Sequence, residues 1–187
     1  MDFLMVLEKK PLIAAFRDIK SLCMQNVKLA DILFILGGTI FDLSLIVAQA
    51  KKYQKLVLVD IDLVKGIGKD AAGIQFLAQQ SRIDGIITTR SNLIKSAQKE
   101  GLIAIQRVFV LDSESLVGGL GAVEKSGPDA VEILPALILP KVMNRIKRIT
   151  SIPVIAGGLV TEKKEVNEIL SCGAIGVSTT ALNLINA

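Results

Sequence analysis

The stretch 152-IPVIAGGLVTEKKE-165 predicts the repeating unit of the fold. An almost continuous apolar run ends at Gly157 and Gly158, and an amphipathic segment follows at 163–173. An apolar run without polar alternation is typical of a strand buried on both faces of a parallel sheet. The stretch therefore predicts a buried strand, a glycine turn and a helix in that order, with Thr161 expected to cap the helix.

The same unit recurs along the chain. Segments of helical period stand at 91–101, 140–150 and 163–173, with Gly101 and Gly173 as helix stops and Pro140 at a helix start. The eight apolar runs begin about 18 to 29 residues apart, at 11–16, 31–36, 55–62, 84–89, 102–106, 129–134, 152–158 and 174–178.

Eight strand–helix units predict a closed (β/α)8 barrel, in which no parallel strand is left at an edge. We expect residues 1–187 to form this one domain, which is smaller than the typical barrel of about 250 residues. The alternative is an open doubly wound sheet. That fold usually has a glycine-rich fingerprint after its first strand, where this chain has AAFRDI.

The composition excludes a disordered or fibrous chain, because 51% of the residues are hydrophobic and 21% are charged. The mean hydropathy of +0.53 is high, but the most apolar region, 31–50, is interrupted by glycines and by Asp42. The apolar stretch between Asp31 and Asp42 is shorter than the run of about 20 apolar residues that a membrane span needs. The N-terminus lacks the pattern of a signal segment. We expect a cytoplasmic protein with no membrane partner.

The chain has no histidine and two cysteines. The lack of histidine removes the commonest general base and the Ser–His and Cys–His nucleophile pairs. Two cysteines without histidine favour neither a disulfide framework nor a zinc site, so no metal and no cofactor are expected. The net charge of +4 permits contact with phosphates or nucleic acid.

Polar residues gather where the predicted strands end. In a barrel these ends converge on one face, where barrel proteins place their sites. Asp60 and Asp62 are two residues apart, so a strand would point both to the same side. The set consists of Asp60, Asp62, Thr88, Thr89, Arg90, Gln106, Arg107 and Glu132. These residues could bind a ligand, or Asp60 and Glu132 could pair with Arg90 and Arg107 as a structural network.

A phosphate site is predicted after the seventh and eighth strands. Barrels commonly bind phosphate there through backbone N–H groups. Gly157 and Gly158 would let the backbone approach an anion, and Ser178, Thr179 and Thr180 would supply hydroxyl groups and a helix start.

Four blocks, GIITTRSNLI, AIQRVFVLDSESL, VEILPALILPKV and IPVIAGGLV, together resemble the glycerol-3-phosphate-responsive antiterminators. The resemblance runs from 11–19 to the closing VSTTALNLI. It implies a phosphate-binding barrel without a demonstrated reaction, which responds to glycerol 3-phosphate and binds leader mRNA of a glycerol-utilisation operon to prevent early termination. It places Asp62, Arg90, Ser91, Gln106, Arg107, Glu132, Pro135, Gly157 and Gly158 at patterned positions of the family.

The chain departs from the family pattern at three positions. Asp60 stands where a histidine is usual, Ala136 where a glycine is usual, and Thr161 where a basic residue is expected. These departures leave the exact ligand open between glycerol 3-phosphate and a similar small phosphate. The full predicted ligand set is Asp60, Asp62, Lys65, Arg90, Ser91, Gln106, Arg107, Glu132, Gly157, Gly158, Ser178, Thr179 and Thr180.

The RNA surface is predicted on one helix. Lys141, Arg145 and Arg148 stand at i, i+4 and i+7, with Lys147 beside them. The alternative is an ordinary solvated helix face, and the chain has few of the aromatic residues that RNA-binding proteins stack on bases.

Two other functions fit the same residues. A small isomerase or lyase acting on a phosphorylated metabolite would use Asp62 or Glu132 as its base and Lys65 as its acid or Schiff-base former. A barrel that only binds a ligand, without RNA, is the third reading. A homo-oligomer is compatible with each of them.

Overall fold

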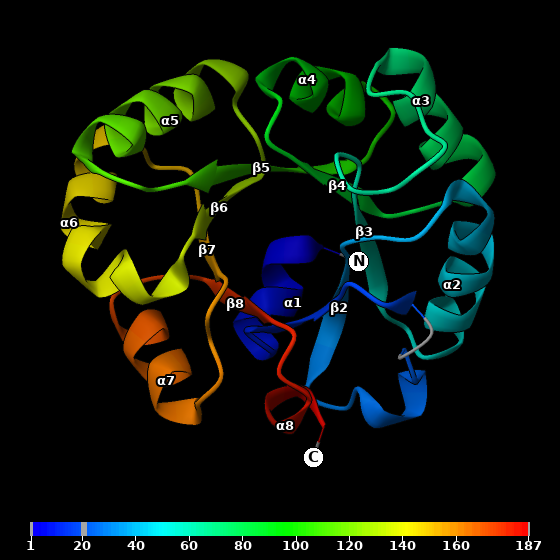
Figure 1. Cartoon of the computed structure of the whole chain (residues 1–187), viewed down its shortest axis with the longest axis horizontal. Helices are drawn as coiled ribbons and strands as arrows, with labels where there is room; N and C mark the ends of the chain where they lie inside the picture. The colour runs from blue at the N-terminus through cyan, green and yellow to red at the C-terminus, as the bar shows by residue number, and fades with distance from the viewer. Residues whose placement is uncertain (1, 20–21, 187) are drawn as a thin grey trace.

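The structure is a computed structural model that describes residues 2–19 and 22–186, and its eight parallel strands form a closed barrel (Figure 1). Neighbouring strands in the barrel are neighbours in the chain, and β1 pairs with β8 to close it. The strands are β1 (Leu12–Phe16), β2 (Ala30–Ile35), β3 (Leu56–Asp60), β4 (Gly85–Thr88), β5 (Ile103–Phe109), β6 (Ala130–Leu134), β7 (Val154–Gly157) and β8 (Gly176–Thr179). The predicted (β/α)8 barrel is confirmed, and the open sheet is wrong because β1 and β8 are paired.

Helices surround the barrel and connect successive strands (Figure 1). The α-helices are α1 (Phe3–Lys9), α2 (Ile40–Lys52), α3 (Ala71–Phe76), α4 (Ser91–Lys99), α5 (Ser113–Ser126), α6 (Leu139–Ile149), α7 (Lys163–Ser171) and α8 (Leu182–Ile185). The described residues also contain the short helical segments η2 (Met24–Asn26), η3 (Leu77–Ser81), which is a π-helix, and η4 (Ala136–Ile138). None of the helices in the described part of the chain combines the length and the apolar character that a membrane span requires.

The first helix closes the end of the barrel at which the strands begin. Phe3, Val6 and Leu7 of α1 are buried in one cluster with Ile13 of β1 and Ile32 of β2. In Figure 1, α1 lies behind the centre of the barrel. Because this end is filled by apolar side chains, the opposite end, where the strands finish, is left for a site.

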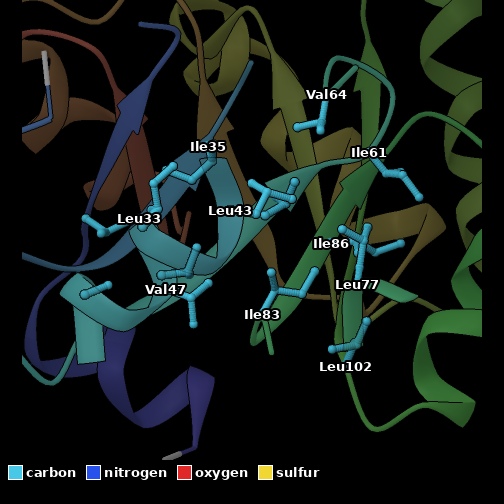
Figure 2. Packing of buried hydrophobic residues seen from close by; sticks show 14 of the residues in the cluster. Leu33, Ile35, Leu43, Val47, Ile61, Val64, Leu77, Ile83, Ile86 and Leu102 are labelled. Carbon is cyan, nitrogen blue, oxygen red and sulfur yellow. The ribbon is translucent and has the colours of Figure 1, made fainter. Parts of the chain in front are cut away.

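The second apolar layer lies between the strands and the surrounding helices. Leu33 and Ile35 of β2 belong to the same buried cluster as Leu43 and Val47 of α2 (Figure 2). This cluster continues across the next strands and helices, and a second cluster covers the other side of the barrel. Alternate residues of each strand therefore face the barrel interior and the helix layer.

The local signals at the helix ends are confirmed in three places and wrong in one. Gly101 and Gly173 follow α4 and α7 with φ of 73° and 109°, and Pro140 lies in the first turn of α6. Thr161 does not cap α7. The N-cap is the next residue, and the carboxylate of Glu165 accepts the N–H group of Thr161 at 2.8 Å.

Candidate functional site

A cavity of about 630 Å³ opens where the strands end. This volume lies in the usual range for small-molecule sites. Of the predicted ligand residues, eight line the cavity: Asp60, Asp62, Arg107, Glu132, Gly158, Ser178, Thr179 and Thr180. The remaining lining residues are Ala15, Arg17, Leu36, Leu63, Thr89, Phe109, Leu134, Leu159, Val160 and Thr161.

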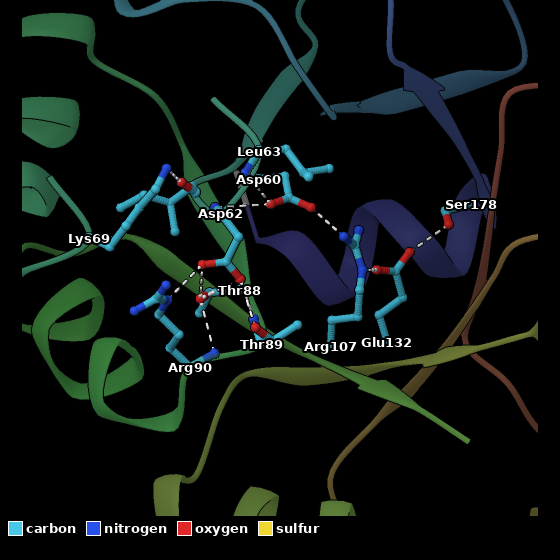
Figure 3. Close-up of polar contacts among 11 residues, drawn as sticks. Asp60, Asp62, Leu63, Lys69, Thr88, Thr89, Arg90, Arg107, Glu132 and Ser178 are labelled. Carbon is cyan, nitrogen blue, oxygen red and sulfur yellow. Dashed lines mark hydrogen bonds and ion pairs between the residues drawn. The ribbon is translucent and has the colours of Figure 1, made fainter. Parts of the chain in front are cut away.

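The floor of the cavity is a buried chain of charged and polar side chains (Figure 3). The Arg107 guanidinium donates from Nε to Glu132 Oε2 at 2.7 Å and from Nη1 to Asp60 Oδ2. Glu132 Oε1 accepts the hydroxyl of Ser178 at 2.6 Å. The strands β3, β5, β6 and β8 each supply one member. The structural network that the sequence left open therefore exists, with Arg107 as its centre.

The charges of this floor cancel only in part. Two buried carboxylates face one buried guanidinium, which leaves one formal negative charge if both carboxylates are ionised. Burial raises the pKa of Asp60, and the opposing charge of Arg107 offsets only part of this effect. Burial by itself would lower the pKa of Arg107, but Glu132 and Asp60 raise it above its ordinary value. Arg107 is consequently a fixed cation whose charge is already compensated by protein groups.

Asp62 forms a second polar cluster at the rim. Strand β3 ends at Asp60, so the expectation that Asp62 lies on the same strand is wrong. Asp62 instead lies in the following turn, where its backbone N–H donates to Asp60 Oδ1 at 3.0 Å. Its carboxylate accepts the Thr89 N–H at 2.7 Å and both threonine hydroxyls of 88–89, and pairs with Arg90 Nε at 3.2 Å. Burial by itself would raise the pKa of Asp62, but the hydrogen bonds from Thr89 and Thr88 and the charge of Arg90 together hold that pKa below its ordinary value.

The two glycines after β7 have different roles. A Cβ atom on Gly157 would lie 2.6 Å from Glu132 Oε1 and 2.7 Å from Ser178 Oγ, so this glycine makes room for the buried network. Gly158 has φ of 80°, and a Cβ there would meet Leu134 at 3.5 Å. Gly158 therefore serves the turn and lines the cavity, whereas Gly157 packs against protein atoms.

The side chains of two predicted ligand residues lie in the helix layer and not in the barrel interior. Gln106 points from β5 into the helix layer, where its amide donates to Ser91 Oγ at 2.8 Å and accepts from the hydroxyl of Ser126. Its neighbours in the strand explain this direction, because Arg107 faces the interior and successive side chains alternate. The predicted position of Gln106 at the mouth is wrong, and Ser91, which the resemblance put in the ligand set, lies with Gln106 in the helix layer.

Lys65 and Arg90 also lie away from the lining. The backbone of Lys65 pairs with Thr39 in the loop after β2, and its side chain is exposed outside the cavity. The lysine that the enzyme alternative requires is thus not in the site. The side chain of Arg90 is 54% exposed and reaches the rim only through its pair with Asp62.

Arg17 is a charged lining residue that is absent from the predicted ligand set. It is the first residue after β1, and it lines the cavity. Asp62 has a similar position in the turn after β3. The rule that was applied to the other strand ends, a polar residue immediately after an apolar run, would have identified Arg17.

The predicted RNA residues form an exposed stripe on α6. The side chains of Lys141, Arg145, Lys147 and Arg148 are all exposed. Arg145 donates to Ser113 Oγ at 3.0 Å and Lys147 donates to the Cys172 carbonyl at 3.2 Å. Within residues 2–19 and 22–186, none of the four forms an ion pair. This stripe lies on the outside of the barrel, apart from the cavity.

Comparison with known proteins places the chain in a family. Residues 12–185 match the pattern of the family described as glycerol-3-phosphate responsive antiterminator. The protein YgcP of Escherichia coli K12, described as uncharacterized, is 34% identical over 96% of this chain and 94% of its own length.

Two solved structures share both fold and sequence with this chain. The glycerol uptake operon antiterminator regulatory protein from Listeria monocytogenes superposes with a TM-score of 0.84 and 34% identity, covering 91% of this chain and 92% of that one. A glycerol uptake operon antiterminator-related protein from Thermotoga maritima superposes with a TM-score of 0.83 and 35% identity, covering 94% and 97%. With the family pattern matched over nearly the whole barrel, this chain belongs to the glycerol-3-phosphate-responsive antiterminator family.

Proposed function

We propose that this protein is a transcription antiterminator that binds glycerol 3-phosphate, or a similar small phosphate, in the barrel cavity. It then acts on the leader mRNA of a glycerol-utilisation operon in the cytoplasm. The observation that carries the ligand half is the cavity at the C-terminal end of the barrel, which combines a carboxylate floor with a polar rim after β7 and β8. Family membership supports the regulatory half.

The polarity of the cavity suits a phosphorylated polyol. The carboxylates of Asp60 and Glu132 can accept hydrogen bonds from ligand hydroxyl groups. A phosphate group would be repelled from these carboxylates. It would instead occupy the side of the mouth where Gly158 and Thr180 offer backbone and hydroxyl donors. The ligand would lie across the mouth with its hydroxyl end over the floor.

Thermal denaturation tests the ligand. A compound that binds the folded chain alone stabilises it by about 2.7 kcal/mol at a hundredfold excess over its dissociation constant. We expect a clear rise in melting temperature with glycerol 3-phosphate and a smaller one with inorganic phosphate or glycerol alone. A rise with another sugar or polyol phosphate but none with glycerol 3-phosphate would refute the ligand assignment.

The stripe on α6 is the proposed RNA contact. Its three regularly spaced cations, Lys141, Arg145 and Arg148, can follow the phosphates of a single strand by charge alone, without stacking aromatics. In an electrophoretic shift assay with leader RNA, the double variant Arg145→Glu and Arg148→Glu should lose binding. The same charge reversal at the exposed Lys95 and Lys99 of α4 is the matched control and should retain it. Equal binding by both double variants would reject α6 as the contact.

A turnover assay separates this function from the enzyme alternative. We expect glycerol 3-phosphate to be recovered unchanged by mass spectrometry after prolonged incubation with the protein. Conversion of the ligand to an isomer or to cleavage products would favour the enzyme instead.

A further inference from the structure

The hydrogen-bond donors that line the cavity divide into two groups. Arg107 is bound to two carboxylates, the Ser178 hydroxyl donates to Glu132, and the Thr179 hydroxyl donates to the Val160 carbonyl at 2.7 Å. The Thr89 hydroxyl donates to Asp62. Each of these donors already has an acceptor in the protein, so a ligand would have to compete for it.

Three other lining donors have no such partner. Among the residues that the structure describes, the side chains of Arg17, Thr161 and Thr180 form no hydrogen bond or ion pair. Arg17 is the one of the three that carries a charge. The cavity therefore contains one cation that is buried and compensated, Arg107, and one that is exposed and available, Arg17.

The strand register places these donors on the same side of the mouth. Strand β1 pairs with β8, with Ala14 opposite Thr179, so the chain beyond β1 emerges beside Thr180. Strand β8 in turn pairs with β7, whose following loop contains Thr161. Among the carboxylates, Asp60 and Asp62 lie farther round the mouth, at the end of β3 and in the turn after it. Glu132 of β6 lies next to β7, and its carboxylate already accepts the Ser178 hydroxyl.

The backbone at Arg17 is held in place while its side chain is not. The Leu36 N–H donates to the Phe16 carbonyl at 2.8 Å. A Cβ on Gly37 would lie 2.7 Å from the Arg17 carbonyl oxygen, so only glycine allows the two loops to pack this closely. A fixed backbone with an unpaired guanidinium is suited to binding a ligand anion, because only the side chain, and not the backbone, has to lose conformational freedom when the ion pair forms.

We propose that Arg17 is the residue that binds the anionic group of the ligand, through a guanidinium–phosphate ion pair beside the Thr161 and Thr180 hydroxyls. This inference rests on the proposed function, in that it assigns the phosphate of the same ligand to the β7–β8–β1 side of the mouth. A guanidinium can donate two parallel hydrogen bonds to a phosphate, which an ammonium group cannot do in the same geometry.

The test compares Arg17→Gln, Arg17→Lys and the wild-type chain by calorimetric titration with glycerol 3-phosphate and, separately, with inorganic phosphate. A lost charge-assisted hydrogen bond should weaken the binding of both compounds by about 10- to 100-fold in Arg17→Gln. Arg17→Lys should retain an intermediate affinity. Lys99→Gln, which removes one exposed positive charge from α4, is the matched control and should bind as the wild type does.

The unliganded melting temperature distinguishes a binding role from a structural one. Arg17 is exposed and unpaired, so Arg17→Gln should melt within about a degree of the wild type, as is usual for surface substitutions. Wild-type affinity for glycerol 3-phosphate in Arg17→Gln would overturn the assignment and leave the proposed function standing. If the wild type bound inorganic phosphate but not glycerol 3-phosphate, the proposed ligand would be refuted. The role of Arg17 would then be decided by whether Arg17→Gln binds inorganic phosphate more weakly than the wild type does. Binding of neither compound by the wild type would overturn both.

Discussion

Gly157 has no space for a side chain because Glu132 and Ser178 occupy the volume beside its Cα atom. Gly157→Ala would place a methyl group against two buried, hydrogen-bonded oxygen atoms. We expect a loss of about 1–3 kcal/mol of unfolding free energy, the usual cost of overpacking. Urea denaturation of the variant and the wild type measures it.

Gly121 provides the control for this substitution. It lies within α5, and a Cβ there would meet nothing within 4 Å. Gly121→Ala should stabilise the protein by about 0.5–1 kcal/mol, because alanine has the higher helix propensity. A Gly157→Ala protein as stable as the wild type would contradict the packing role assigned to this glycine.

Asp60 contributes to stability in a pH-dependent way. Its pKa is raised by burial in the folded state, so protonation is favoured by folding. The contribution of this group is fully present below the ordinary pKa of an aspartate and is lost as the pH rises through its raised pKa. Because Asp60→Asn resembles the protonated residue, the variant should melt above the wild type near pH 7. The two melting temperatures should converge near about pH 4.

Asp62 should behave in the opposite way. Its pKa is lowered in the folded state, so the ionised form stabilises the fold at neutral pH and this contribution is lost on acidification. Asp62→Asn should therefore melt below the wild type at neutral pH and approach it in acid. Melting curves of both variants and the wild type, recorded by circular dichroism between about pH 4 and pH 7, show whether each substitution raises or lowers the melting temperature. A drop in melting temperature for Asp60→Asn at pH 7 would contradict the account of the floor.

Strand β5 joins the cavity to the helix layer through two adjacent residues with opposite directions. Arg107 faces the cavity, and Gln106 is bound to Ser91 of α4 and Ser126 of α5. Gln106→Met keeps the side-chain volume but removes both hydrogen bonds and leaves the Ser91 hydroxyl without this donor. We expect a loss of about 1–3 kcal/mol of stability and a ligand affinity within about twofold of the wild type.

Arg17→Gln should show the reverse pattern, with reduced affinity and unchanged stability. Measuring ligand affinity and stability for both variants therefore distinguishes a residue that stabilises the helix layer from a residue that binds the ligand. A large loss of affinity in Gln106→Met, with the melting temperature unchanged, would return Gln106 to the binding site.

The barrel is filled at one end and open at the other, and the two ends should respond independently to mutation. Leu7 of α1 is 1% exposed and packs inside the closed end. Leu7→Ala should lose about 2–5 kcal/mol of unfolding free energy through the cavity it creates. Leu4, in the same helix but 41% exposed, is the control, and Leu4→Ala should change stability little.

Ligand affinity should be the same in both α1 variants below their melting temperatures. The mouth is formed by strand ends on the far side of the interior, with buried residues of the barrel between it and α1. Titration of Leu7→Ala at low temperature measures this. A loss of affinity as large as the loss of stability would show that the two ends are coupled.

Strand β5 is longer than the sequence pattern predicts. The predicted strand stops at Gln106, because polar residues after an apolar run resemble a strand end. The structure extends β5 to Phe109, with Arg107 opposite Glu132 in the register. Each of the two polar residues is satisfied by a partner from a distant segment, and such partners are invisible in a local pattern.

The sequence by itself determined the closed barrel, its helix stops and the end of the barrel that carries the cavity. These follow from local patterns, namely apolar runs at a regular spacing, glycine after each of two helices, and polar residues after strands. The tertiary structure decided which polar residues share the cavity, that Gly157 makes room for Glu132 and Ser178, and that Lys65 and Gln106 lie elsewhere. It also decided that Arg107 is compensated and Arg17 is free, because the pairing of charges depends on contacts between residues that are distant in the sequence.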